Sequence, residues 1–274
     1  MSAEVHGLDQ FYASPTGIVA KRLLRARLRA VWPELAGSEV LGIGYAGPYL
    51  RLWRRRAARL ISIMPVQGPP PGRLSRWPAD GPGALALAEE ENLPFADLSF
   101  DNVLMVHGLE HADHARRMLR EVWRVLRDEG RLLVVVPNRR SIWAHLDHTP
   151  LGHGQPYTPL QLARLLERGM FHVERRDGAL FVPPFRSRLL LRTARLWEGA
   201  GHAVSPKLSG VTIIEARKEV FGALSLRTQP SGRRVNVPAW VGRGLAPAAR
   251  GQGHVRPADE VLAREADPGG EGTR

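Results

Sequence analysis

The 274-residue chain contains no cysteine. This absence excludes disulfide bonds, thiolate zinc sites and a cysteine nucleophile, and it fits a cytoplasmic protein, which is the location we expect. Long hydrophobic runs are also missing, because the longest aliphatic stretch, residues 132–136, is far too short to cross a bilayer. Residues 1–10 lack a basic patch followed by an apolar stretch, so we expect no secretory signal.

Lysine is scarce, accounting for only three of the 39 basic residues. The formal net charge of +12 would favour a nucleic-acid partner if the charge were clustered. The arginines are instead spread along the chain, with residues 54–56 as the densest short run, and interleaved aromatic and basic residues are not apparent. A small-molecule substrate is therefore the favoured partner, nucleic acid is the alternative, and an anionic substrate is compatible with the charge.

Three regions differ in composition. Residues 1–35 are predicted to form a helical segment, since Ser14 suits an N-cap, Pro15 suits the first helical position, and apolar residues follow at helical spacing. Residues 36–226 read as one domain. Residues 227–274 are rich in glycine, proline and arginine without apolar periodicity, and we predict a disordered basic tail.

Strands and helices alternate through the central domain. Strands are predicted over residues 40–43, 60–64, 101–106, 131–136, 171–175 and 211–217, and helices over residues 48–56, 112–126, 159–167 and 189–197. Residues 67–83 are full of proline and glycine and are predicted to be a loop. The alternation implies an α/β fold with a doubly wound, mostly parallel sheet of about seven strands and helices on both faces.

A glycine-rich turn follows the first predicted strand. Residues 42–47 satisfy the pattern G-x-G-x-x-G between a strand and a helix, which is the setting of a dinucleotide fingerprint and favours an NAD(P)-dependent oxidoreductase. The acidic residue expected about 20 positions later is missing, because the second strand ends at Met64 and Pro65. A tight turn that binds no ligand is a further alternative.

Four segments, in order and correctly spaced, point to another family. They are VLGIGYAG at residues 40–47, NLPFADLSFDNV at 92–103, GLEH at 108–111 and LREVWRVLRDEGRL at 119–132. Together they resemble the motifs of class I S-adenosylmethionine (SAM) methyltransferases of the type 11-like group. The resemblance implies a Rossmann-like methyltransferase fold, SAM as cofactor and methyl transfer to an unidentified substrate.

The same resemblance assigns roles to residues. Gly44 and Gly47 would let the backbone approach the methionine end of SAM, whose carboxylate suits a helix N-terminus. Glu91 and Asn92 fall where the family reads the adenine, and His107 would face the cofactor at the end of the fourth strand. The positions implied at the cofactor are Gly42, Gly44, Tyr45, Gly47, Met64, Glu91, Asn92, Leu93 and His107.

Signature residues of the family are replaced in this chain. The acid of the first motif is Gly42, later glycines are Ala46 and Pro48, and the acid that binds the ribose hydroxyls is Met64. Losing a charged acceptor costs about 1.5–3 kcal/mol, which would weaken SAM binding by roughly tenfold to a hundredfold unless another group, such as Gln67, substitutes. These replacements favour the alternative of a non-catalytic methyltransferase-like binding or scaffold protein.

Histidines and aromatic residues supply the remaining candidates. His107, His111 and His114 have spacings that would share a helix face, but the segment begins as a strand end, and we expect no metal site. His107 is a candidate general base, with a pocket-lining role as the alternative, and no catalytic residue is assigned. Tyr12, His153 and Tyr157 are candidates for contact with the substrate. The sequence leaves the oligomeric state open.

Overall fold

The computed structural model describes residues 2–65, 85–89, 91–146, 149–184, 193–194, 197–199, 201 and 209–220. All of them belong to one compact unit, Met1–Gln229. Several predictions fall outside the described residues: the basic tail, the loop over residues 67–83 with Gln67, and most of the helix over residues 189–197.

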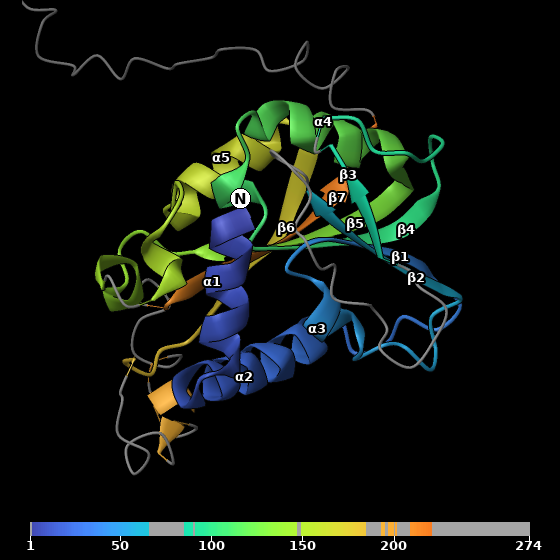
Figure 1. The fold of residues 1–274 in the computed structure, drawn as a ribbon. Helices are drawn as coiled ribbons and strands as arrows, with labels where there is room; N and C mark the ends of the chain where they lie inside the picture. Colours follow the sequence, from blue (N-terminus) through green and yellow to red (C-terminus); the bar gives the residue numbers. More distant parts are fainter. Residues whose placement is uncertain are drawn as a thin grey trace, which may run out of the picture. The chain divides into compact units, whose positions relative to one another are not determined.

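Seven strands form one sheet, in the order β3-β2-β1-β4-β5-β7-β6. The first five are parallel, whereas β7 runs antiparallel to both β5 and β6. This mostly parallel sheet confirms the predicted α/β class (Figure 1), although β3 was not predicted. The strands are β1 (Glu39–Gly44), β2 (Arg59–Pro65), β3 (Leu85–Ala88), β4 (Phe100–Val106), β5 (Leu126–Pro137), β6 (Phe171–Ala179) and β7 (Val211–Lys218).

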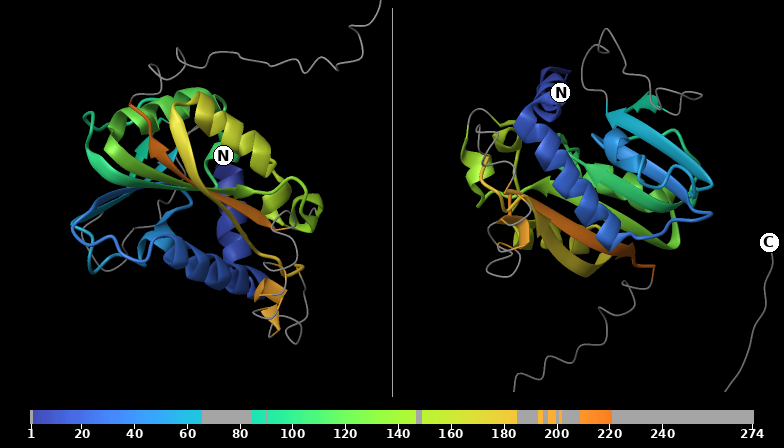
Figure 2. Two further views of the ribbon diagram at one scale, coloured as in Figure 1. Left: turned by 180° about the vertical axis from the view of Figure 1, so that it is seen from behind. Right: turned by 90° about the horizontal axis from the view of Figure 1, so that it is seen from below.

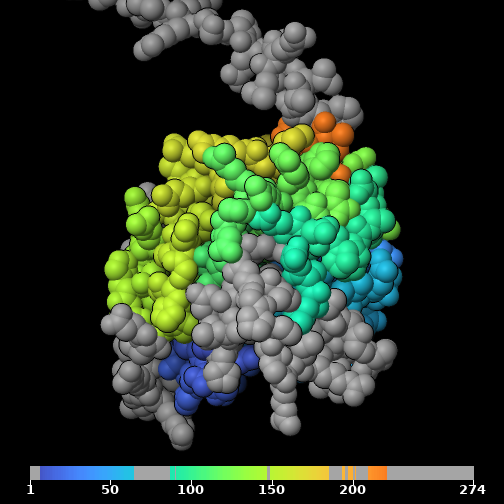
Figure 3. Space-filling view, turned by 45° about the horizontal axis from the view of Figure 1, so that its top comes forward, coloured from blue at the N-terminus to red at the C-terminus, as the bar shows by residue number. Residues whose placement is uncertain are grey.

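Helices cover both faces of the sheet, as Figures 1 and 2 show. On one face α1, α2 and α3 enclose a core with alternate side chains of β1, β4 and β5, and on the other α4 and α5 enclose a second core. Figure 3 shows the outer surface that α4 (green) and α5 (yellow-green) form. The helices are α1 (Ser2–Ala13), α2 (Pro15–Val31), α3 (Gly47–Leu50), α4 (Ala115–Val125) and α5 (Pro159–Arg168), with short 3-10 turns η1 (Leu109–His111), η2 (Ile142–His145) and η3 (Pro150–Gly152).

Capping residues define where the helices begin. Ser14 accepts a hydrogen bond from the Gly17 amide at 3.1 Å, which confirms the predicted start of α2. Thr158 and Gln161 form a reciprocal capping box at the start of α5. Among the described residues, no helix combines the length and the hydrophobicity needed to cross a bilayer.

Two helices differ from the prediction. In the predicted helical segment of residues 1–35 one helix was expected, beginning after Ser14. Helix α1 precedes it as a separate helix that was not predicted, and it places Leu8, Phe11 and Tyr12 in the core. Helix α3 ends at Leu50, and residues 51–56 form turns rather than the helix expected there. The result is a connection from β1 to β2 whose arginine side chains are exposed.

The register of the central strands fixes the location of the site. Gly44, the last residue of β1, pairs with Val106, the last residue of β4, and Val106 pairs with Val135 of β5. The carboxyl ends of these parallel strands therefore lie together at one edge. In open α/β sheets this is the edge at which ligands bind.

Candidate functional site

The turn after β1 depends on a glycine in the left-handed region. Gly44 has φ +73°, and a Cβ atom there would lie 2.5 Å from the Val106 carbonyl oxygen and 3.0 Å from the Gly108 Cα atom. The Tyr45 amide donates to the same Val106 oxygen at 2.6 Å. Only glycine allows this approach of the two strand ends, because any side chain would collide with backbone.

Gly42 is also enclosed, but by side chains. A Cβ atom at Gly42 would lie 2.6 Å from Leu50 Cδ1 and 2.8 Å from Ala46 Cβ. Helix α3 therefore packs directly on the position at which the methyltransferase motif carries an acid. Met64, at the other acid position, is half-buried near the end of β2, so neither position supplies a carboxylate.

A buried histidine follows β4. His107 has φ +50°, an unusual backbone conformation for a side-chain-bearing residue, and it is 3% exposed. Its Nδ1 atom lies 2.8 Å from Glu110 Oε1, and its Nε2 atom lies 2.8 Å from the Tyr12 hydroxyl. Both contacts are hydrogen bonds when Nδ1–H donates to Glu110 Oε1 and the Tyr12 hydroxyl donates to Nε2.

Helix α1 brings aromatic rings onto this histidine. The Tyr12 ring stacks on the Tyr45 ring and meets the Phe11 and Tyr49 rings edge-on. Burial raises the pKa of the Tyr12 hydroxyl far above its ordinary value and does the same to the pKa of Tyr45, which also feels the charge of Asp9. Both hydroxyls therefore stay neutral and able to donate hydrogen bonds at physiological pH.

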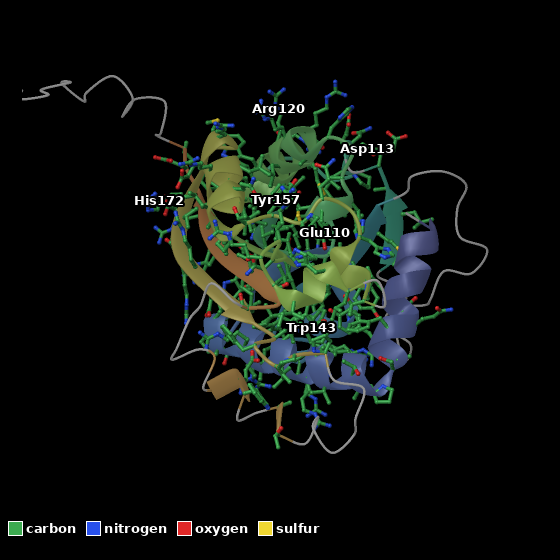
Figure 4. All side chains as sticks on the ribbon, turned by 90° about the vertical axis from the view of Figure 1, so that its left-hand side faces the viewer. Glu110, Asp113, Arg120, Trp143, Tyr157 and His172 are labelled. Atoms are coloured by element: carbon green, nitrogen blue, oxygen red, sulfur yellow. The ribbon has the colours of Figure 1, made fainter. Side chains whose placement is uncertain are left out.

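The connector before α5 closes over Glu110. Gln155 N donates to the Glu110 carbonyl oxygen at 2.7 Å, and Tyr157 is half-buried with a pKa raised by burial and by the Glu110 charge. In Figure 4 the labels of Glu110 and Tyr157 lie near the middle of the view and those of the exposed Asp113 and Arg120 toward its upper edge. The second carboxylate oxygen of Glu110, Oε2, is buried without a hydrogen-bond partner among the described residues.

The other predicted positions are dispersed. Glu91 forms a surface ion pair with Arg117 at 2.8 Å, Asn92 is exposed, and Leu93 packs in the second core. His153 is exposed and does not join Tyr12 and Tyr157. Within the ranges that the structure covers, no three potential metal-ligating side chains gather at one point.

Sequence reasoning did not assign Glu110 a role at the cofactor edge. The residue was visible in the L-E-H motif, but its spacing of three from His107 suggests contact only on a helix. Contact is made here because the left-handed backbone at His107 turns the chain into η1.

Comparison with known proteins finds a family model and relatives that match the chain. A family model described as "Methyltransferase domain" matches residues 34–134. An uncharacterized protein of Mycobacterium tuberculosis is 30% identical over 206 residues, which cover 70% of this chain and 68% of that protein. A demethylmenaquinone methyltransferase of Thermotoga maritima is 40% identical over 53 residues, 19% of this chain and 23% of that protein.

Solved structures share the fold. A SAM-dependent methyltransferase of Thermotoga maritima superposes with a TM-score of 0.55 at 18% identity, covering 80% of this chain and 98% of that one. A SAM-dependent methyltransferase of Mesorhizobium loti gives a TM-score of 0.51 at 16% identity, covering 70% and 96%. The family model thus assigns residues 34–134 to a methyltransferase domain, and the solved structures show that the chain has the fold of SAM-dependent methyltransferases.

The residues at the carboxyl edge fit part of a SAM site. The Gly44 turn retains the close backbone approach on which that site depends, and the polar pair His107–Glu110 lies beside it. The two acid positions do not fit, because α3 fills the space at Gly42 and Met64 offers no acceptor of comparable strength. The geometry of the Gly44 turn is thus compatible with a SAM site, whereas the residues at the two acid positions are not.

Proposed function

We propose that the chain is a SAM-dependent methyltransferase that acts on an unidentified small molecule, with SAM bound at the carboxyl edge of β1 and β4. The observation that carries the proposal is the Gly44 turn packed against Val106 and Gly108, directly beside the buried His107–Glu110 pair. A glycine forced to φ +73° at this edge is the feature that a ligand-binding turn needs.

The backbone at Gly44 and Gly47 would hold the methionine end of the cofactor, and Glu91 and Asn92 lie on the segment facing the adenine. When bound, SAM supplies a methyl group on a sulfonium centre. Transfer of that group requires mainly that the two reacting atoms be aligned. Tyr12 and Tyr157 would then enclose the substrate and keep water out, whereas the exposed position of His153 gives it no such role.

His107 is proposed to accept a proton from the substrate. Glu110 fixes the ring tautomer through Nδ1 and would stabilise the imidazolium that forms, as a carboxylate does for the histidine of a catalytic triad. Nε2 is bonded to the Tyr12 hydroxyl, so a substrate hydroxyl or amine has to displace that group to reach it. Binding of substrate therefore requires the Tyr12 side chain, helix α1, or both to move.

A second function is favoured by the packing at Gly42. With Leu50 against that position and Met64 in place of an acid, neither of these two positions supplies the carboxylate that the family's motifs carry there. This arrangement supports the alternative of a non-catalytic methyltransferase-like binding or scaffold protein. The match to the methyltransferase family model argues against the NAD(P)-dependent oxidoreductase, and the cytoplasmic location stays a prediction.

Calorimetry and thermal shift with SAM, S-adenosylhomocysteine and NADP, measured in parallel on the full chain, separate these functions. Stabilisation by SAM and S-adenosylhomocysteine, without a response to NADP, is the expected result. A response to none of the three would contradict the enzyme and support the scaffold protein. A response to NADP alone would favour the oxidoreductase.

A further inference from the structure

A hollow lies away from the carboxyl edge. It has a volume of about 560 Å³ and opens between the end of α2 and the turns that follow α3, which lie along the same face of the sheet (Figure 1). The Arg56 carbonyl accepts a hydrogen bond from the Gly37 amide, just before β1 begins. The hollow therefore lies toward the edge where β1 and β2 start, opposite the His107 site.

Arginine dominates the lining of this hollow. Its charged side chains come from five arginines and one carboxylate, Glu34. The arginines are Arg29, Arg51, Arg54, Arg55 and Arg56, all exposed, and we call this site the arginine cleft.

The wall of the arginine cleft includes a buried tryptophan. Trp53 is 3% exposed, and its indole Nε1 donates to the Trp32 carbonyl oxygen at 2.9 Å. The Trp32 ring meets it at 6.0 Å between centroids and is itself bonded to Glu215 at 2.8 Å. Because Trp53 is buried, its ring is not available for stacking on a base, and recognition in the cleft depends on charge.

Some exposed arginines of the described surface have close carboxylate partners. Arg59, Arg117 and Arg127 each have a carboxylate partner within 2.8 Å. In the arginine cleft Arg56 pairs with Glu34, while Arg51 and Arg55 form no ion pair with any described residue.

Ordinary structural roles account for only part of this set. Arg29 lies in the last turn of α2, where a cation offsets the negative helix end. Arg51 and Arg55 follow α3 in irregular turns and have no such role. Several guanidinium groups around one hollow would repel one another unless an anion lies between them.

We propose that the arginine cleft binds a compact small molecule that carries several phosphate groups. Guanidinium groups match phosphate oxygens in paired hydrogen bonds, and several arginines around one hollow suit a chain of phosphates better than a single anion. The volume falls within the range of small-molecule sites. An extended nucleic-acid strand would need a basic track with aromatic platforms, whereas this charge is confined to one hollow with a buried tryptophan.

The test is titration calorimetry of the full chain with inorganic tripolyphosphate, at low and at physiological ionic strength. The double variant Arg51→Gln/Arg55→Gln removes two cleft charges. The control Arg116→Gln/Arg120→Gln removes two exposed charges from α4, on another face. These two arginines have the same spacing in the sequence as Arg51 and Arg55. Melting temperatures verify folding, and the single variant Arg55→Gln replaces the double variant if the latter is unstable.

We expect tripolyphosphate to bind the wild-type chain, more weakly at higher salt. The cleft variant should lose about tenfold or more in affinity, and the α4 variant should be unchanged. Equal losses in both double variants would overturn the proposal, as would no binding at low salt. Binding of a short single-stranded RNA without binding of tripolyphosphate would also overturn it. Binding of S-adenosylhomocysteine should be the same in all variants, so the outcome is independent of the proposed methyl transfer.

Discussion

The rings of Tyr12 and Tyr45 are stacked, with centroids 5.0 Å apart and planes 12° from parallel. Tyr12 belongs to α1 and Tyr45 to the turn after β1, so the stack joins the N-terminal helix to the glycine turn. The Tyr12 hydroxyl extends the connection to His107 at the end of β4. One side chain thus links the three elements that surround the proposed cofactor edge, and access to that edge is coupled to the position of α1.

The Tyr12–His107 hydrogen bond can be removed without removing the ring. Tyr12→Phe should keep the stack on Tyr45 but leave the buried Nε2 atom of His107 without its partner. We expect the free energy of unfolding to fall by about 1–3 kcal/mol, as measured by urea denaturation. Tyr157→Phe, which changes a half-buried hydroxyl, is the control and should cost less. A stability equal to wild type in Tyr12→Phe would mean that the bond adds nothing.

Two glycines with similar backbone conformation differ in their surroundings. Gly44 has φ +73° and backbone atoms within 3.0 Å of a built Cβ, whereas Gly37 has φ +71° and nothing within 4 Å. Gly37→Ala should therefore cost only the left-handed strain, about 1–2 kcal/mol. Gly44→Ala should cost clearly more in thermal denaturation. It should also abolish the stabilisation by S-adenosylhomocysteine, which Gly37→Ala retains, and equal effects of the two substitutions would contradict this account.

Much of the fold follows from local sequence signals. The strands around residues 40–43, 101–106 and 131–136 were predicted because apolar runs lie between turn residues, and the capped helices because Ser14 and Thr158 precede them. Helix α1 was missed because its signal is one apolar turn, Leu8 to Tyr12, whose stability comes from packing on distant residues.

The site was harder to predict than the fold. His107 was recognised from its place at a strand end, but its bond to Tyr12 joins residues far apart in sequence, and no local pattern indicates it. The packing of Leu50 on Gly42 is a contact between α3 and β1, which a propensity argument does not give. Local rules therefore located the carboxyl edge, and tertiary contacts determined which side chains occupy it.

Gly42→Asp restores the acid that the family carries at this position, and it tests whether the carboxyl edge then binds SAM more tightly. Gly42→Asp places a Cβ atom 2.6 Å from Leu50 Cδ1, so we expect a destabilised protein with no gain in SAM affinity. The double variant Gly42→Asp/Leu50→Ala removes the nearer of the two crowding side chains, leaving Ala46 Cβ at 2.8 Å, and should recover part of the SAM affinity relative to Gly42→Asp. Leu50→Ala alone is the control for the cavity that this change leaves. Stronger SAM binding by Gly42→Asp without the second change would show that α3 moves readily to accommodate the carboxylate.

The environment of Glu121 predicts how the stability of the folded protein changes at acid pH. Its Oε2 atom accepts hydrogen bonds from Arg124 at 2.8 Å and from the Leu93 amide at 3.0 Å, and the Arg124 guanidinium, followed by that amide, lowers the pKa of Glu121 below its ordinary 4.5. Since the folded pKa lies below the unfolded one, the stabilisation is fully present above pH 4.5 and is lost as pH falls through the folded pKa. Glu121→Gln should therefore be less stable than wild type at neutral pH, with the difference shrinking below pH 4.5 in urea denaturation. Glu167 forms an exposed ion pair with Arg176 at 3.7 Å, so Glu167→Gln should show almost no such trend. A loss of stability in Glu121→Gln that does not change with pH would refute the linkage.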